Sequence, residues 1–241
     1  MKFRFVLIAA AIALAACTDR EAAQREAAAV LAQQQEEAAA DLAEKYDQEL
    51  VAQRWEKARI HGAALLAQYP NTKAAAQVKQ TFDDTKTKAE AQREQDRLSS
   101  LWNYSETPAG KGVQRSASIY SKDTVDVDGT GPRTVQLIFR DHPEWERSSY
   151  LVLRTSDFAK ACYASCSVTV ATDGGAPKKM SANRPKTDQA TAMFIDDYKA
   201  LWKLAGKSKQ IEIEFPVKAG GTRKAVFETG GVNKERMPGW N

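Results

Sequence analysis

Three cysteines and two histidines are the side chains of this 241-residue sequence best suited to covalent or metal chemistry. Cys17 closes a short apolar run, whereas Cys162 and Cys166 belong to the stretch CYASC. His61 and His142 stand alone, without an HExxH motif or a third ligand close in sequence, so a zinc site is not expected. A serine nucleophile needs a neighbouring base, and no GxSxG motif accompanies either histidine. The sequence therefore predicts no catalytic centre, no metal and no cofactor.

The first sixteen residues have the pattern of a bacterial lipoprotein signal peptide. Lys2 and Arg4 supply a positive start, residues 5–13 form an apolar core, and small residues precede Cys17. A segment of this length is shorter than the roughly 20 apolar residues that span a bilayer, and it fits a cleaved secretory signal. We expect cleavage of residues 1–16 and acylation of Cys17. The alternative is a buried apolar N-terminal helix in which the cysteine is incidental.

A lipid-anchored Cys17 predicts a location in the bacterial cell envelope, facing the periplasm. Several acyl chains on one residue give stable membrane attachment where a single chain is reversible. Thr18 occupies the position at which Asp serves enterobacteria as an inner-membrane retention signal, so the outer membrane is favoured over the inner one. Asp19, one residue later, weakens that preference.

The remaining cysteines, Cys162 and Cys166, are expected to pair. The periplasm is oxidising, and two cysteines left after lipidation of Cys17 are typical of a structural disulfide there. A five-residue loop stabilises less than the roughly 3 kcal/mol expected for a 15-residue loop. Their CxxxC spacing differs from the CxxC of thiol oxidoreductases, which argues against a redox function.

Three carboxylates in SKDTVDVDGTG raise the possibility of a cation site. Asp123, Asp126 and Asp128 loosely follow a calcium-loop spacing, but the final Glu of that motif is missing. We interpret the stretch as a solvated turn, with a weak cation site as the alternative. The Asp126/Asp128 pair and His142 are also the only residues on which a hydrolase hypothesis can be built.

Composition divides the chain near residue 102. Residues 18–101 contain 12 basic and 15 acidic side chains, and they are rich in the helix formers Ala, Gln, Glu and Lys. Residues 102–241 contain 21 basic and 16 acidic side chains and alternate Gly, Pro, Thr and Val in short runs. The first part is expected to be helical and the second to be built of strands. Near-neutral charge and an envelope location exclude a nucleic-acid partner.

Residues 42–101 are expected to form a helical hairpin that resembles a single tetratricopeptide-type helix pair. Pro70 ends the first helix, and Asn71 or Thr72 can cap the second. Apolar residues recur at steps of three and four on both sides of this break. The first stripe comprises Val51, Trp55, Ala58, Gly62, Leu65 and Tyr69, and the second comprises Ala75, Val78, Phe82, Thr85 and Ala89.

Residues 17–41 are expected to be a tether between the lipid and the hairpin. Only Val30 and Leu31 in this stretch are large and apolar, so it is either a lone helix or a flexible spacer. A continuous helix from residue 18 to residue 69 would reach about 78 Å.

The C-terminal part, residues 102–241, predicts an antiparallel β-sandwich-like domain with one helix over it. Asp196 or Asp197 can cap the helix, which Gly206 closes. Glycine pairs in TDGG and AGG indicate hairpin turns. The overall class is thus α+β. The strand candidates are residues 115–121, 133–140, 149–155, 166–172, 190–195, 209–217 and 223–229.

The order of core and turn residues in this part resembles that of TagO-like periplasmic proteins, which are encoded beside type VI secretion genes. It also resembles the related β domains of invasion-associated locus B-like envelope proteins. The likeness covers about residues 102–232. It implies a small envelope β domain and supplies no catalytic residues. The residues that carry it are Trp102, Tyr104, Gly110-Lys111, Ala117-Ser118 and Ser121, with the runs LIFR, SVTV, TAMFID, KSKQIEIEF and KAVFET.

Two features of the β domain are candidates for partner binding. Trp145 lies between two glutamates in PEWER, where burial is difficult, and tryptophan is enriched at binding hot spots. Lys178, Lys179, Arg184 and Lys186 form a basic stretch that we expect to be an exposed loop.

The function expected from these features is that of a non-catalytic, lipid-anchored envelope protein. Its β domain would bind another periplasmic, envelope or secretion-system component. One alternative is an immunity lipoprotein that neutralises a periplasmic toxin. Another is a hydrolase of envelope polymers, which the absence of a matched nucleophile and base makes the weakest of the three.

Overall fold

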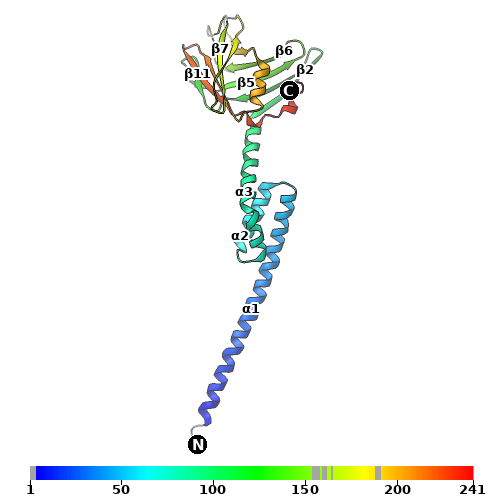
Figure 1. Ribbon diagram of the computed structural model, residues 1–241, viewed down its shortest axis with the longest axis vertical. Coiled ribbons are helices and arrows are strands. Elements are labelled where there is room, and N and C mark those ends of the chain that lie inside the picture. Colours follow the sequence, from blue (N-terminus) through cyan, green and yellow to red (C-terminus); the bar gives the residue numbers. More distant parts are fainter. Residues whose placement is uncertain (1–3, 154–157, 159–161, 164, 188–190, 241) are drawn as a thin grey trace. The chain divides into compact units, whose positions relative to one another are not determined.

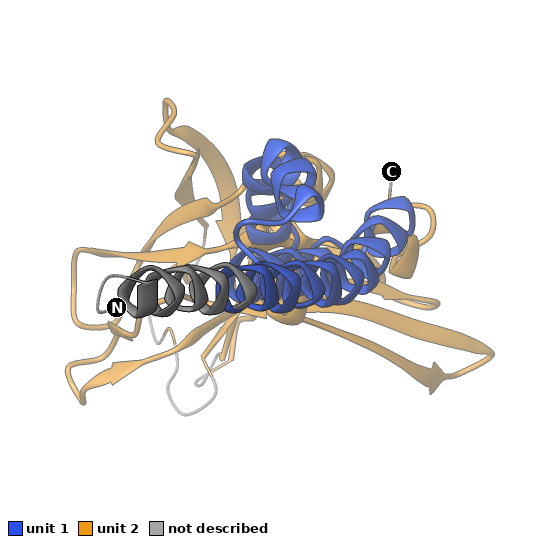
Figure 2. Cartoon of the chain, turned by 90° about the horizontal axis from the view of Figure 1, so that it is seen from below, with its two compact units in different colours: residues 1–93 blue, residues 94–241 orange. Residues whose placement is uncertain are grey.

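A computed structural model describes residues 4–153, 158, 162–163, 165–187 and 191–240, with side chains from Arg20 onward. The chain forms two compact units, residues 1–93 and residues 94–241, which Figure 2 distinguishes by colour. Unit 1 is helical. Unit 2 contains a nine-stranded antiparallel sheet and one α-helix, which confirms the α+β class.

Three helices, rather than the two that were predicted, follow one another from the N-terminus (Figure 1). They are α1 (Arg4–Val51), α2 (Trp55–Gln68) and α3 (Lys73–Ser100), and α3 continues from unit 1 into unit 2. Helix α2 packs against α1. A continuous helix from residue 18 to residue 69 is therefore not formed, because α1 ends at Val51 and the chain reverses there.

The reversal after α1 depends on backbone hydrogen bonds that the sequence does not announce. Gln53 has a φ of 54° and donates its N–H to the Leu50 carbonyl at 3.0 Å. Arg54 donates its N–H to the Glu49 carbonyl at 2.9 Å, and its side chain pairs with the Glu49 carboxylate. This is a Schellman motif, which usually has Gly at the left-handed position. Because Gln53 occupies this position, the sequence lacks the glycine that usually marks such a helix end.

The core of unit 1 is centred on Tyr46, which is 1% exposed. Its hydroxyl forms hydrogen bonds with Thr81 Oγ1 at 2.8 Å and Thr85 Oγ1 at 2.7 Å, joining α1 to α3. Gly62 of α2 lets the three helices approach, because a Cβ there would lie 2.8 Å from Phe82 and 3.0 Å from Tyr46. The buried members of this core are Ala39, Tyr46, Ala58, Leu65, Ala74, Ala75 and Val78.

The predicted apolar stripes are confirmed except at their start. The second stripe lies in the core or at its margin, and so does the first stripe from Trp55 onward. Val51 is 86% exposed, because α1 ends there and the chain turns away. Residues 20–35 are all exposed and helical, so the first part of the predicted tether is a solvated helix.

The turn between α2 and α3 has the expected cap. The Thr72 hydroxyl accepts a hydrogen bond from the Ala75 N–H at 3.2 Å, as an N-cap residue does. The Glu36 carboxylate of α1 accepts the Lys73 N–H at 3.0 Å. Two otherwise unpaired donors at the start of α3 are thereby satisfied, in keeping with the need to cap a helix terminus.

Unit 2 is built on one continuous antiparallel sheet with the strand order β1-β2-β5-β6-β9-β8-β7-β10-β11. A two-stranded ribbon, β3 and β4, lies outside it in the pairing scheme. The strands are β1 (Trp102–Ala109), β2 (Gly112–Tyr120), β3 (Val125–Asp126), β4 (Pro132–Arg133), β5 (Val135–His142), β6 (Glu146–Leu153), β7 (Cys166–Thr172), β8 (Lys178–Asn183), β9 (Ala192–Ile195), β10 (Ile211–Pro216) and β11 (Thr222–Phe227).

The sheet curls, so that chain segments from its two ends are joined by hydrogen bonds. Lys122, directly after β2, donates its N–H to the Val226 carbonyl of β11 at 2.7 Å. Ala219 donates its N–H to the Val127 carbonyl at 3.4 Å. Helix α4 (Tyr198–Ala205) packs against β6 and buries Leu201, Trp202 and Ala205. Figure 1 shows α4 lying against the curved strands.

The ends of α4 follow the sequence signals. The Asp197 carboxylate accepts the Ala200 N–H at 3.0 Å, and Gly206 is the C-cap residue. Two short 3₁₀ helices, η1 (Thr229–Gly231) and η2 (Lys234–Arg236), complete the chain. Trp240 then packs into the core beside Trp202.

None of the helices in the described part of the chain combines the length and apolar character that crossing a bilayer requires.

Candidate functional site

The hairpin between β5 and β6 presents the most exposed aromatic side chain of the described residues. Trp145 is 65% exposed and lies in the turn that connects His142 to Glu146. The stretch DHPEW therefore forms the end of β5 and the tip of the hairpin. An exposed indole of this size is unusual, since large aromatic groups gain most from burial.

His142 holds Trp145 in a fixed orientation. The two rings stack with centroids 4.0 Å apart and planes 8° apart. His142 Nδ1 accepts hydrogen bonds from the Glu144 N–H at 3.1 Å and the Trp145 N–H at 3.2 Å. His142 is only 7% exposed, so it serves as a rigid support under the tip. Two polar contacts and one stacked face thus fix an indole that projects into solvent.

Arg140 extends the tip along the sheet. Its guanidinium carbon lies 5.5 Å from the Trp145 ring centre and 5.3 Å from that of Tyr150. Tyr150 in turn contacts Phe194 of β9, with ring centres 5.0 Å apart. Burial raises the pKa of Tyr150, and the positive charge of Arg140 acts in the opposite direction. We call Trp145, Arg140 and Tyr150, with His142 beneath them, the Trp145 surface.

Strand register explains why these side chains meet. Arg140 and His142 alternate with buried Phe139 and therefore share the face of β5 that points away from the core. Tyr150 pairs with Ile138 across β5 and β6, which places it on the same face. The sequence identified Trp145 and did not identify Arg140 or Tyr150, whose proximity depends on the strand pairing.

The adjacent β1–β2 turn supports the tip. The Glu144 carboxylate lies against Gly110, which has a φ of 54°, so that any side chain at residue 110 would displace it. A Cβ at Gly112 would lie 2.8 Å from the Pro143 ring. Two hairpin ends therefore pack together and limit the motion of Trp145.

The predicted basic loop is corrected by the structure. Lys178 and Lys179 begin strand β8, where they pair with Val170 and Thr169 of β7. Arg184 is 4% exposed, donates from Nη2 to the Thr187 carbonyl at 3.0 Å and lies 5.0 Å from the Tyr163 ring centre. Lys186 follows in an exposed bend. The four residues do not form one exposed loop, because strand pairing and burial separate them.

The cysteine prediction is confirmed for one pair. Cys162 and Cys166 form a disulfide with Cα atoms 4.8 Å apart, and Cys166 is the first residue of β7. The side chain of Cys17 lies outside the described residues, so its acylation stays a prediction. His61 belongs to α2 and is remote in sequence from any chemistry of unit 2.

Two of the three carboxylates in the SKDTVDVDGTG stretch, those of Asp126 and Asp128, stabilise turns. Asp126 Oδ1 accepts the Gly129 N–H at 2.8 Å, and Asp128 Oδ1 accepts the Thr130 hydroxyl at 2.6 Å. Nowhere in the described ranges do three histidine, cysteine or carboxylate side chains gather closely enough to hold a metal ion.

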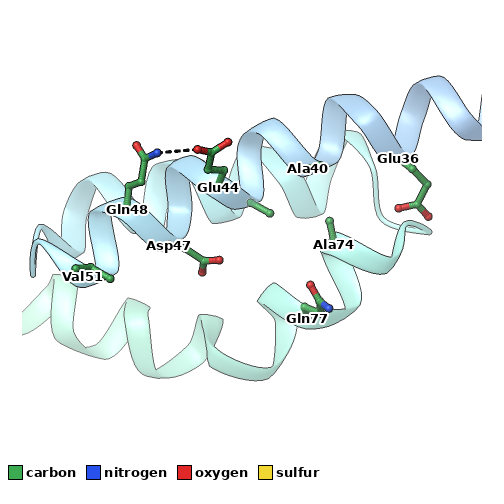
Figure 3. Close-up of a pocket in the computed structure, with 9 residues that line it drawn as sticks. Glu36, Ala40, Glu44, Asp47, Gln48, Val51, Ala74 and Gln77 are labelled. Carbon is green, nitrogen blue, oxygen red and sulfur yellow. Dashed lines mark hydrogen bonds between the residues drawn. The ribbon is translucent and has the colours of Figure 1, made fainter.

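Unit 1 has an acidic groove of about 750 Å³ between α1 and α3, shown in Figure 3. Glu36, Glu44 and Asp47 line it. Glu36 caps α3, and Glu44 accepts a hydrogen bond from Gln48 at 3.0 Å. Two of its three acids therefore already stabilise helices, which makes the groove a weaker candidate than the Trp145 surface.

Comparison with known proteins found no matching family model, no similar curated protein and no similar solved structure. The resemblance to TagO-like and invasion-associated locus B-like domains accordingly stays a prediction. The functional proposal for this chain therefore rests on the geometry of the Trp145 surface.

Proposed function

We propose that this chain is a non-catalytic bacterial lipoprotein, anchored through Cys17, that binds another envelope protein through the Trp145 surface. The observation that supports it most directly is the 65% exposed Trp145 ring, held by stacking on His142. Trp, Tyr and Arg are the residue types most enriched among binding hot spots, and all three are adjacent here. A rigid aromatic anchor loses little conformational entropy when a partner covers it.

The supporting residues of the tip are consistent with a binding role. His142, a candidate general base, uses Nδ1 to hold the turn and one ring face to hold Trp145. Asp126 and Asp128 accept hydrogen bonds from their own turn. These contacts assign structural roles to the residues on which the hydrolase alternative was based.

Crosslinking from the tip tests the proposal. A photoreactive amino acid replaces Pro143, next to the tip, in the full chain, and crosslinked proteins are identified from intact cells by mass spectrometry. We expect one envelope protein to be crosslinked, and we expect Trp145→Ala to reduce the yield at least about tenfold, since hot-spot truncations lose 2 kcal/mol or more. Val51→Ala, which truncates a residue that is 86% exposed in unit 1, should leave the yield unchanged.

Two results would count against the proposal. An equal yield with Trp145→Ala and Val51→Ala would show that the tip does not carry the interaction. Capture of a secreted toxin would instead support the immunity-lipoprotein alternative, because an immunity protein of this kind binds its toxin in the periplasm.

A further inference from the structure

A second concave site lies in unit 2 between α4 and the C-terminal segment. Its volume is about 510 Å³, within the range of small-molecule pockets. Residues from three separate parts of the sequence line it: β6, α4 with the following turn, and residues 234–240. We call it the lysine pocket, after Lys199, Lys203, Lys207 and Lys234 at its wall.

The floor of the lysine pocket is aromatic and rigid. Trp202 and Trp240 contact each other with ring centres 5.3 Å apart, and Tyr198 lies 5.5 Å from Trp240. Trp202 is 2% exposed and Trp240 is 7% exposed. Their buried Nε1 atoms have no hydrogen-bond partner among the described residues, which is uncommon for buried indoles.

Arg147 fixes the wall formed by the C-terminal segment. Its Nη1 donates to the Gly239 carbonyl, and its Nε donates to Asp141 Oδ2 at 3.1 Å. Gly239 has a φ of 82°, and a Cβ there would lie 2.6 Å from Arg147 Nη2. The positive φ and the close approach of Arg147 therefore favour glycine at this position.

The positive charge of the four lysines is not offset by described carboxylates, whereas Arg147 is paired with Asp141. No acidic residue lines the pocket, and none of its four lysines forms an ion pair with a described carboxylate. Lys199 and Lys203 lie four residues apart on α4, a spacing at which like charges destabilise a helix, and Lys207 follows just after the helix ends. Lys199 also lies in the first turn of α4, where the helix dipole disfavours a positive charge.

Helix stability alone does not explain this arrangement. Lysines near the C-terminal end of α4 complement the dipole, and Lys234 lies directly over Gly206 there. That reasoning covers Lys203, Lys207 and Lys234. It does not cover Lys199, nor the like-charge spacing between Lys199 and Lys203. A ligand that brings negative charge would remove both penalties.

We propose that the lysine pocket binds a phosphate-bearing sugar, either free or as the head group of an envelope glycolipid. A phosphate monoester carries a charge of about −1.5 to −2 at pH 7 and offers three acceptor oxygens. Lysine binds phosphate as a mobile point charge, and four lysines line this pocket. The aromatic floor favours a ligand with an apolar face, which a sugar ring has and a free phosphate ion lacks.

Titration of the full chain carrying Cys17→Ala, which prevents lipid attachment, tests this site. Glucose 6-phosphate, glucose and inorganic phosphate are added while the five tryptophan indole N–H signals are followed by NMR. We expect saturable binding of glucose 6-phosphate, with shifts of the Trp202 and Trp240 signals and none of Trp145. Glucose should not bind, and inorganic phosphate should bind at least about tenfold more weakly.

A matched pair of double variants separates a specific site from general electrostatic attraction. K199Q/K203Q removes two lysines of the pocket, whereas K178Q/K179Q removes two exposed lysines of β8 and the same amount of charge. The first should weaken binding at least about tenfold, and the second less than about twofold. All four lysines are exposed, so neither variant should unfold the protein.

Phosphatidylcholine vesicles with and without a phosphorylated glycolipid distinguish the two sources of the ligand. Retention on glycolipid vesicles alone identifies a lipid-held sugar phosphate, and binding of the soluble sugar alone identifies a free one. Equal weakening by both double variants would overturn the proposal, because it would show unspecific attraction. The proposal would also be overturned if neither glucose 6-phosphate nor the phosphorylated glycolipid bound. Neither result bears on the Trp145 surface.

Discussion

Some residues in this protein have structural roles that their residue type does not predict. Gln53 occupies the left-handed position at the end of α1, where glycine is usual. His142, which sequence reasoning weighed as a base or a metal ligand, supports an exposed indole. In both cases the backbone conformation or the ring packing, rather than the local sequence pattern, determines the role.

Gln53→Gly should stabilise unit 1. A non-glycine residue in the left-handed region costs roughly 1–2 kcal/mol, and the greater freedom of glycine in the unfolded chain returns part of that gain. We expect the free energy of unfolding to rise by about 0.5–1 kcal/mol. Urea denaturation followed by circular dichroism at the helix band measures it.

Gln48→Gly is the matched control for that substitution. Gln48 lies in the last turns of α1 with an exposed side chain, so glycine there should lower the free energy of unfolding by about 1 kcal/mol. The interpretation of the α1 terminus would be wrong if both substitutions destabilised the protein.

At the scale of elements, local signals predicted most of what the structure contains. Strand β7 and the Asp197 cap of α4 follow directly from alternation and capping chemistry. Strand β1 was missed, because it is an edge strand with mostly exposed side chains and no alternation. Strand β8 was missed, because it opens with two exposed lysines. Burial on one face, which creates the alternating pattern, is weak in β1, and in β8 it is limited to Met180 and Ala182.

The end of α3 within unit 2 provides a pH-dependent contact. Arg97 donates to both carboxylate oxygens of Glu228, at 2.8 Å and 3.3 Å, and this hydrogen bonding lowers the pKa of Glu228 below its usual 4.5. A depressed carboxyl pKa stabilises the folded state above the unfolded-state value, and the effect disappears as the pH falls through the folded-state value. Glu228→Gln should therefore destabilise the protein at pH 7, and the deficit should shrink below about pH 4.5.

Urea denaturation of the unsubstituted protein and of Glu228→Gln, each at pH 7 and pH 3, measures the difference in the free energy of unfolding. Glu235→Gln is the control, since Glu235 is exposed and forms no ion pair with a described residue. A Glu228→Gln deficit that stays constant over this pH range would show that the ion pair contributes nothing measurable, as many partly exposed pairs do.

At the scale of the whole chain, the sites depend on pairings that no local pattern encodes. The lysine pocket joins β6, α4 and residues 234–240, which are far apart in sequence. No local sequence pattern predicts that Trp240 packs against Trp202. By contrast, the exposure of Trp145 was predicted correctly, because a large aromatic residue between two glutamates cannot easily be buried.

Removal of residues 1–16 should leave unit 1 intact. The buried core residues of that unit begin at Ala39, and residues 20–35 are exposed, so none of the residues that make up the described core would be removed. From the signal-peptide pattern of residues 1–16, we expect the mature protein to start at acylated Cys17 and to fractionate with membranes. Intact-mass measurement should show the loss of the first sixteen residues and the added mass of the acyl chains.

Cys17→Ala should move the protein into the soluble fraction without changing its helix content, because residue 17 lies before the core. The double variant C162S/C166S is the control, since it removes the other two cysteines and should keep the protein on the membrane. Membrane retention by Cys17→Ala would contradict anchoring by lipid and would favour the alternative of a buried N-terminal helix. Loss of retention in both variants would instead indicate that misfolding, rather than lipidation, controls the fractionation.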